Sequence, residues 1–197
     1  MKVIKKNTDA DSICISYLNE EKVLILPTDT VYGFSGIIHK TEHKIRSIKG
    51  RGDDKPFIVL IGRPEDVYTI TDLPIPEPLF SMWPGPLTLI VPDKKTNKTT
   101  AVRCPGDEWL RSIILRCGSP IYSTSVNRSG FPVITSIKDI VSEFSQEVDL
   151  IVDDGDSGTS IPSTIVSLTQ QYAAVIRQGS IVIPEEVLKQ PLPYQYE

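Results

Sequence analysis

Short apolar runs recur along the chain and are bounded by proline, glycine and other turn residues. They are rich in Val, Ile and Leu, a composition typical of buried β-strands. The pattern predicts strands over 23–26, 57–61, 87–91, 119–122, 150–152, 163–166 and 173–176.

Segments with apolar residues at helical spacing lie between these runs. Thr8 or Asp9, Thr41 and Ser136 stand where the N-caps of three such segments are expected, because their side-chain oxygens can accept from free backbone N–H groups. The pattern predicts helices over 9–20, 41–48, 77–83, 107–117 and 137–144.

Alternating strands and helices indicate the α/β class. Several strands follow one another directly over 150–176, which favours a twisted mixed sheet, parallel and antiparallel, with helices packed on it. A length of 197 residues fits one domain, predicted over 1–189. The tail 190–197 has no apolar period and is expected to trail on the surface.

The composition is that of an ordinary globular protein, with 40% hydrophobic and 23% charged residues. No run approaches the ~18 apolar residues of a membrane span, and no apolar segment follows the N-terminal lysines. We therefore expect a cytoplasmic protein with no membrane contact. Its three scattered cysteines predict neither a disulfide framework nor a zinc site, but buried, inert thiols.

The net charge of −4 is unevenly distributed. Residues 40–63 carry seven Lys or Arg against three acids, whereas residues 139–197 carry ten acids against two bases. A local positive patch in an acidic protein indicates an anionic ligand bound at one place, although such runs are more often solvated helix faces.

Several common catalytic motifs are missing from the sequence. It has no G-x-S-x-G elbow, no P-loop and no G-x-G-x-x-G fingerprint. His39 and His43 are the two histidines, and their i, i+4 spacing lacks a partner motif, so no protein-bound metal is expected.

Polar segments follow the predicted strands, where α/β sheets bind their ligands. They occupy 27–33, 122–130, 162–164 and 177–179. Segment 49–56 leads into a strand and holds Lys49 and Arg51 among glycines, which let backbone approach a phosphate closely. Taken alone, segment 49–56 is better interpreted as a basic surface loop.

In combination, these segments resemble the YrdC-like family of threonylcarbamoyl-AMP synthases, in order from about Val23 to Gly179. The matching pieces are PTDTVYG (27–33), KGR and KPF (49–51, 55–57), PGPLT (84–88), AVRCP (101–105), STSVNRSG (123–130), PSTIV (162–166) and RQG (177–179). The family's Lys-x-Arg and Ser-x-Asn tetrad corresponds to Lys49, Arg51, Ser125 and Asn127, which the resemblance implies are catalytic.

The resemblance implies that L-threonine, bicarbonate and ATP, with Mg²⁺, give threonylcarbamoyl-adenylate and pyrophosphate. Downstream proteins would transfer the threonylcarbamoyl group to tRNA. The implied nucleotide-binding residues are Arg51, Lys55, Thr99, Ser125 and Arg177. The implied threonine-binding residues are Thr28, Tyr32, Arg103, Ser123 and Ser163, with Arg103 pairing the substrate carboxylate.

The sequence departs from the family pattern in two places. Val126 replaces the alanine common in Ser-Ala-Asn, and Leu60 stands where longer members have a histidine. The chain resembles the short, single-domain type. Two alternatives stay open: a double-stranded-RNA-binding or ribosome-maturation module, against which the charge of −4 weighs, and a nucleotide-binding paralogue with another acceptor.

Overall fold

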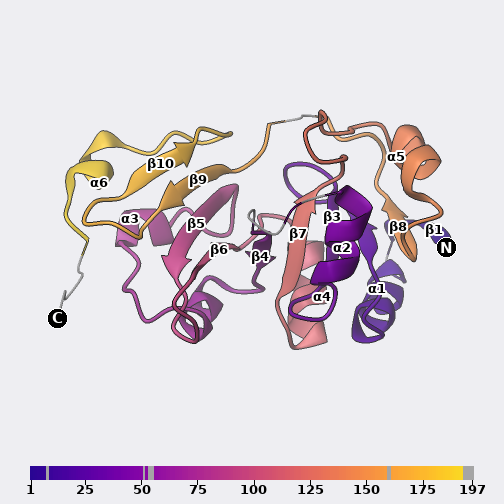
Figure 1. The fold of residues 1–197 in the computed structure, drawn as a ribbon, viewed down its shortest axis with the longest axis horizontal. Helices are drawn as coiled ribbons and strands as arrows, with labels where there is room; N and C mark the ends of the chain where they lie inside the picture. The colour runs from indigo at the N-terminus through magenta and orange to yellow at the C-terminus, as the bar shows by residue number, and fades with distance from the viewer. Residues whose placement is uncertain (8, 51, 53–55, 159–160, 193–197) are drawn as a thin grey trace.

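The computed structural model describes residues 1–7, 9–50, 52, 56–158 and 161–192, and its strands form one ten-stranded sheet (Figure 1). The strands are β1 (Lys2–Lys5), β2 (Leu24–Leu26), β3 (Gly33–Ile37), β4 (Ile58–Leu60), β5 (Leu87–Pro92), β6 (Thr99–Arg103), β7 (Ile121–Ser125), β8 (Leu150–Asp153), β9 (Thr164–Ser167) and β10 (Ala174–Arg177). Their order across the sheet is β1-β8-β2-β3-β7-β4-β6-β5-β9-β10.

The sheet is mixed, which confirms the fold class expected from the sequence. β8 pairs in parallel with β1 and β2, and parallel pairs also join β4 to β6 and β5 to β9. The remaining neighbours are antiparallel. The helical segments are α1 (Ala10–Asn19), α2 (Glu42–Lys49), the 3-10 helix η1 (Pro64–Thr69), α3 (Glu77–Phe80), α4 (Glu108–Cys117), α5 (Ile137–Phe144) and α6 (Glu185–Lys189).

Helices cover both faces of the sheet because strand side chains alternate between them. Leu24 and Leu26 pack in one cluster with residues of α1 and α4. Ile25, between them, packs in a second cluster with residues of α2 and α5, where the rings of Phe34 and Phe144 meet edge to face at 4.9 Å. A third cluster gathers β5, β9, α3 and α6.

The predicted helices and strands are present, with shifted ends. The helix expected over 77–83 ends at Phe80, with Ser81 as its C-cap, and Pro84 disfavours helical backbone at Trp83. The strand expected over 119–122 begins at Ile121 and continues to Ser125. The polar residues 123–125, expected to follow that strand, therefore lie within it.

Five elements were not expected from the sequence: β1, β3, β6, η1 and α6. Gly33 and Gly36 remove side chains from β3, and β6 begins with two threonines, so neither reads as an apolar run. β1 has only two apolar residues, side by side between lysines, and its side chains are mostly exposed. Pairing with neighbouring strands, not local composition, stabilises β1, β3 and β6.

The N-cap predictions have mixed outcomes. Ser136 caps α5 as expected, accepting from the backbone N–H of Asp139 at 3.4 Å. Asp9 and Thr41 occupy the N-cap positions of α1 and α2 as expected, but neither side chain accepts a capping hydrogen bond, because both residues have helical rather than extended backbone angles. Asn7 Oδ1 accepts from the first backbone N–H groups of α1 instead, and Thr8 lies outside the described residues.

The expectation of a surface tail is wrong for Leu192. Leu192 is buried in the third core cluster, and its N–H donates to the carbonyl of Gln171 at 2.8 Å. Pro191 forms an isolated bridge with Tyr172. A single leucine between prolines leaves no periodic pattern, which is why the sequence did not reveal this contact; residues 193–197 lie outside the described part.

No helix in the described part of the chain combines the length and apolarity needed to cross a membrane. The three cysteines are free, as expected, and burial raises the pKa of each thiol: to about 12 for Cys14 and Cys104 and to about 11 for Cys117.

Candidate functional site

The register of the sheet gathers polar residues on one face. Ile58 of β4 lies opposite both Ala101 of β6 and Ser123 of β7. Because alternate residues of a strand share a face, Arg103 lies on the face of Ala101, and Ser125 on the face of Ser123. Serines of β7 and the arginine of β6 therefore point to the same side of the sheet.

This face continues to the β10 edge. Ile90 of β5 lies opposite Ala101, so Thr88, two residues earlier, shares the face. Thr88 lies opposite Ile165 of β9, and Ile165 lies opposite Arg177 of β10. We call the surface formed by these residues the site face: Thr88, Arg103, Ser123, Ser125 and Arg177.

Lys49 joins α2 to the end of β7. Gly50 follows it with a φ of +60°, which ends the helix and suits a residue without Cβ. Lys49 Nζ donates to the carbonyl oxygens of Ser125 and Asn127 at 2.5 and 2.9 Å, and to Asn127 Oδ1 at 2.9 Å. Ser125 Oγ donates to the same Asn127 Oδ1 at 2.7 Å.

Three of the four residues implied to be catalytic thus form one hydrogen-bonded cluster around the Lys49 ammonium, which is 2% exposed. The fourth, Arg51, and the nucleotide-binding candidate Lys55 lie outside the described residues. The Val126 departure lies between Ser125 and Asn127, but its side chain is fully buried in the second core cluster. Replacing the family's alanine by valine therefore alters packing in the core and leaves the polar cluster around Lys49 unchanged.

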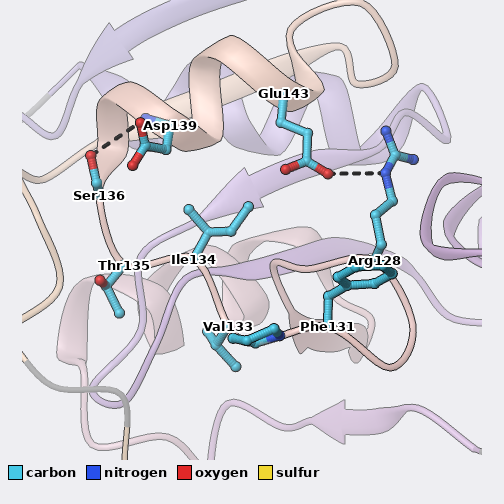
Figure 2. Close-up of a pocket in the computed structure, with 9 residues that line it drawn as sticks. Arg128, Phe131, Val133, Ile134, Thr135, Ser136, Asp139 and Glu143 are labelled. Atoms are coloured by element: carbon cyan, nitrogen blue, oxygen red, sulfur yellow. Dashed lines mark hydrogen bonds and ion pairs between the residues drawn. The ribbon is translucent and has the colours of Figure 1, made fainter.

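A cavity of about 540 Å³ lies along the segment 128–136 that follows Asn127, with Asp139 and Glu143 of α5 also in its lining (Figure 2). Asn127 Nδ2 donates at 2.8 Å to the carbonyls of Arg128 and Phe131, which begin the cavity wall. Phe131 is 70% exposed, and Ile134 and Ser136 continue the lining toward α5. The cavity offers an aromatic ring and exposed backbone next to Asn127.

Arg103 is 4% exposed and makes three hydrogen bonds to the protein. Nε donates to the carbonyl of Gly85 at 3.1 Å, Nη1 to Thr30 Oγ1 at 2.9 Å and Nη2 to Asp29 Oδ1 at 2.6 Å. The other oxygen of Asp29 accepts from the backbone N–H of Gly106 at 2.7 Å. Arg103, expected to pair a substrate carboxylate, is here paired with the carboxylate of Asp29.

Thr28 stands next to this arginine cluster. Its hydroxyl donates to the carbonyl of Val31 at 2.7 Å and lies 3.1 Å from the Thr30 hydroxyl. Thr28 also lines a cavity of about 250 Å³ between the 27–32 loop and residues 154–158. The threonine-binding candidates Thr28 and Arg103 are therefore linked through Thr30.

Ser163 and Arg177 meet on the site face. Ser163 Oγ lies 2.8 Å from Thr88 Oγ1, and Arg177 Nη2 donates to the Ser163 carbonyl at 2.9 Å and to its hydroxyl at 3.2 Å. Desolvation lowers the pKa of Arg177, and the positive charge of Arg103 lowers it further. A residue implied to bind threonine thus contacts one implied to bind nucleotide, with a second arginine close by.

Tyr32 holds two loops together. Its hydroxyl donates to the carbonyl of Gly155 at 2.7 Å and accepts from the backbone N–H of Asp154 at 2.8 Å, and burial raises its pKa. Tyr32 lines the 250 Å³ cavity, but its hydroxyl is occupied by the protein. Contact with threonine stays a prediction.

The position of the Ser123 hydroxyl accounts for the glycine, Gly33, that ends the PTDTVYG segment. A Cβ added at Gly33 would lie 2.5 Å from Ser123 Oγ, closer than real Cβ contacts. Ser123 is itself 9% exposed. The absence of a side chain at position 33 makes room for the Ser123 hydroxyl between β3 and β7.

Thr99 lies apart from the other candidates. It is exposed at the first position of β6, whereas Arg103 is at the last. Thr99 borders a cavity of about 830 Å³ lined by Phe57, Tyr122 and Arg46 among others. The structure does not bring Thr99 into contact with the Lys49 cluster.

The sequence analysis did not assign roles to Asp29, Thr30 and Thr88, although each lies within a quoted motif. The positive character expected over 40–63 is partly balanced locally: Arg46 pairs with Glu42 at 2.7 Å, and Lys40 pairs with Glu21 at 3.1 Å. Fewer cations of this segment are therefore available to an anionic ligand than the seven Lys and Arg residues in 40–63 indicated.

Comparison with known proteins agrees with this arrangement. The family model described as "Telomere recombination", which joins Sua5, YciO and YrdC proteins, matches residues 16–179. The chain is 30% identical over 187 residues to the threonylcarbamoyl-AMP synthase of Pyrococcus abyssi, covering 88% of this chain and 55% of that protein. It is 33% identical over 181 residues to the synthase of Bacillus subtilis, covering 83% and 51%.

A solved structure supports the same relationship. The crystal structure of P. abyssi Sua5 complexed with L-threonine superposes with a TM-score of 0.86 and 27% identity, covering 98% of this chain and 62% of that one. The chain spans about half the length of the two synthases. From the family model, the identities and the fold together, the chain belongs to the Sua5/YciO/YrdC family.

Proposed function

We propose that this chain makes threonylcarbamoyl-AMP and pyrophosphate from L-threonine, bicarbonate and ATP. The observation that carries the proposal is the buried Lys49–Ser125–Asn127 cluster at the end of β7. Its Ser125 lies on the sheet face that also presents Arg103 and Arg177. The two synthases that the chain resembles support it, as does the L-threonine in the P. abyssi structure.

The two substrates would meet where their implied binding residues meet. Ser163, which the resemblance implies binds threonine, contacts Arg177, which it implies binds the nucleotide. Ser123, for threonine, and Ser125, for nucleotide, are alternate residues of β7. Threonine near Arg103 and the phosphates near Lys49, Arg51 and Lys55 would bring the amino group and the α-phosphate together over this junction.

The reaction needs two bond-forming steps. The threonine amine attacks the carbon of bicarbonate, and loss of water leaves a carbamate. A carbamate oxygen then attacks the α-phosphorus of ATP, the bond to the β-phosphate breaks, and pyrophosphate leaves. No covalent intermediate with the protein is required, so fixed cations would act by orienting the reactants and stabilising charge as it develops.

Mg²⁺ would enter with ATP and neutralise charge on the departing pyrophosphate. Mg²⁺ commonly binds through substrate phosphates and water with one or two carboxylates, not through a protein cage. The described residues fit that mode, since none of them form a group of three His, Cys, Asp or Glu side chains able to hold a metal.

The product is a mixed anhydride, and so an activated donor of the threonylcarbamoyl group. We propose that transfer proteins consume it to modify an adenosine of tRNA. Direct contact of this chain with RNA is not favoured by its charge: the net value is −4, and affinity for RNA rests largely on phosphate contacts.

Pyrophosphate release from ATP and Mg²⁺ tests the function, measured with and without L-threonine and bicarbonate. Lys49→Ala and Arg51→Ala should abolish release, and Lys44→Ala, on the exposed side of the same helix, should leave it unchanged. Release that ignores threonine would contradict the proposal in favour of another acceptor. No release from the folded wild type would contradict it outright.

A further inference from the structure

We propose that Asp29 is the residue that positions Arg103 for the carboxylate of the amino-acid substrate. Asp29 touches neither the reacting atoms nor the substrate in this scheme; it acts through Arg103. The inference rests on the proposed function, because it concerns how the same site recognises L-threonine.

The first argument is the count of donors on Arg103. A guanidinium has five N–H donors. Gly85, Thr30 and Asp29 accept three of them, one from each nitrogen. Two N–H groups, one on each terminal nitrogen, have no acceptor among the described residues. A carboxylate has two oxygens and can accept from both in the forked geometry that arginine favours.

The second argument is that Asp29 is itself fixed. Its Oδ2 accepts from Gly106 N–H while its Oδ1 accepts from Arg103, so the carboxylate bridges the 27–32 loop, the end of β6 and the loop after it. A Cβ at Gly106 would lie 2.8 Å from Asp29 Oδ2, so glycine permits this approach. Held at both oxygens, Asp29 allows the guanidinium one orientation.

The third argument is burial. The side chains of Arg103 and Asp29 are 5% and 19% exposed in their ion pair. An arginine so buried needs a counter-charge when no substrate is bound. Asp29 supplies it and still leaves two donors for an incoming carboxylate. Arg177, the neighbouring cation, has no such carboxylate partner among the described residues and stays available to phosphate.

Calorimetric binding of two ligands tests the proposal: L-threonine, and L-threonine amide, which lacks the carboxylate. Wild type should bind the amide far more weakly. Asp29→Asn keeps the shape of the side chain but removes its charge and its second acceptor. The variant should bind L-threonine about tenfold more weakly, the loss of roughly one well-oriented contact, and should bind the amide as wild type does.

Two further variants complete the test. Thr30→Val removes the oxygen that accepts from Arg103 Nη1. This variant should also bind L-threonine more weakly than wild type and bind the amide as wild type does. Asp11→Asn is the matched control, because Asp11 also pairs with an arginine, Arg116 near the end of α4, and neither residue bonds to Asp29, Thr30 or Arg103. It should change neither affinity.

The outcomes separate the proposals. If Asp29→Asn weakened the binding of L-threonine and of the amide equally, the inference would be overturned, since the residue would then only support the fold. Tighter L-threonine binding would also overturn it, because Asp29 would then compete with the substrate for Arg103. Wild type that binds L-threonine and releases no pyrophosphate would contradict the proposed function while leaving the positioning role standing.

Discussion

The buried cations of the site make most of their hydrogen bonds to the protein itself. Lys49 donates to three oxygens of the segment that ends β7, and Arg103 donates to three oxygens in two loops. Such contacts fix the cations before any ligand arrives. Charged groups held in place need little reorganisation when negative charge develops, which is how fixed dipoles and cations accelerate reactions.

This arrangement predicts that Lys49 supports the fold as well as the reaction. Lys49→Met should lower the free energy of unfolding by about 2 kcal/mol, because buried acceptors lose their donor. Urea denaturation measures the change, with Lys44→Met as the exposed control on the same helix. An unchanged midpoint for Lys49→Met would show that the buried contacts contribute nothing to stability.

Arg51 is expected to behave differently. Its role in the resemblance is to bind phosphate, so Arg51→Ala should cost far more in turnover than in stability. Paired measurement of pyrophosphate release and of the urea midpoint checks this. A variant that is inactive only because it unfolds would remove the support for Arg51 as a phosphate-binding residue.

The thiols give a prediction about pH. Burial raises the pKa of Cys14 and Cys104 to about 12 and that of Cys117 to about 11, so all three are protonated near pH 8. Because the folded pKa values lie above the ordinary value of 9.0, their contribution to stability is complete below pH 9 and declines as pH rises toward 12. Alkylation by iodoacetamide at pH 8 should be slow in the native protein and fast in guanidinium. Fast native alkylation of Cys14 or Cys104 would contradict the burial of these two thiols; Cys117 is half-buried.

The grouping of site residues was predictable where short motifs carry them. Lys49, Ser125 and Asn127 belong to such motifs, and the structure places them in contact. The pairing of Asp29 with Arg103 was not predictable, because the two are 74 positions apart and meet only through the register of β6 and the path of the 27–32 loop. Sequence spacing contains no information on that distance.

At the scale of elements, the close approach of β3 and β7 shapes the site. Gly33↔Ser125 and Ser35↔Ser123 are paired residues of these two strands. The 2.5 Å between a Cβ at position 33 and Ser123 Oγ leaves no room for alanine beside serine.

Gly33→Ala should therefore destabilise the protein, by about 1–3 kcal/mol as overpacking commonly does. Adding Ser123→Ala should restore part of that loss, because it removes the clashing oxygen while Ser123 Cβ lies 3.7 Å away. Thermal unfolding of the two single variants and the double variant forms a complete cycle. Strictly additive effects would rule out the contact as the cause.

Elements with a clear apolar run were predictable, whereas those without one were not. α5 occupies the residues expected for it, 137–144, because its apolar positions and its cap agree. β3 and β6 were not predicted, although they contain the site residues Gly33 and Arg103. The polar residues that serve the site thus dilute the apolar signal that identifies a strand.

At the scale of the whole molecule, segments far apart in sequence complete one sheet. β1 pairs with β8, and the final described residues pack under the opposite end, where Leu192 enters the third core cluster. Alternation of strands and helices was enough to predict a mixed α/β sheet. The strand order was not, since it depends on pairings that local patterns do not encode.

The buried end of the chain gives a stability prediction. Leu192→Ala should lower the free energy of unfolding by about 2 kcal/mol, the lower range for a buried leucine. Leu115→Ala, a leucine 40% exposed on α4, is the matched control and should cost well under that. Equal effects in urea denaturation would show that the tail does not pack as described.

The central claim is that this chain joins L-threonine, bicarbonate and ATP on the site face. Mass spectrometry of the reaction mixture tests it most directly, with ¹³C-labelled and unlabelled bicarbonate compared side by side. The account predicts threonylcarbamoyl-AMP that carries the label in its carbamoyl carbon and is absent with Arg51→Ala. ATP turnover by folded wild-type protein that yields no labelled adenylate would contradict the account.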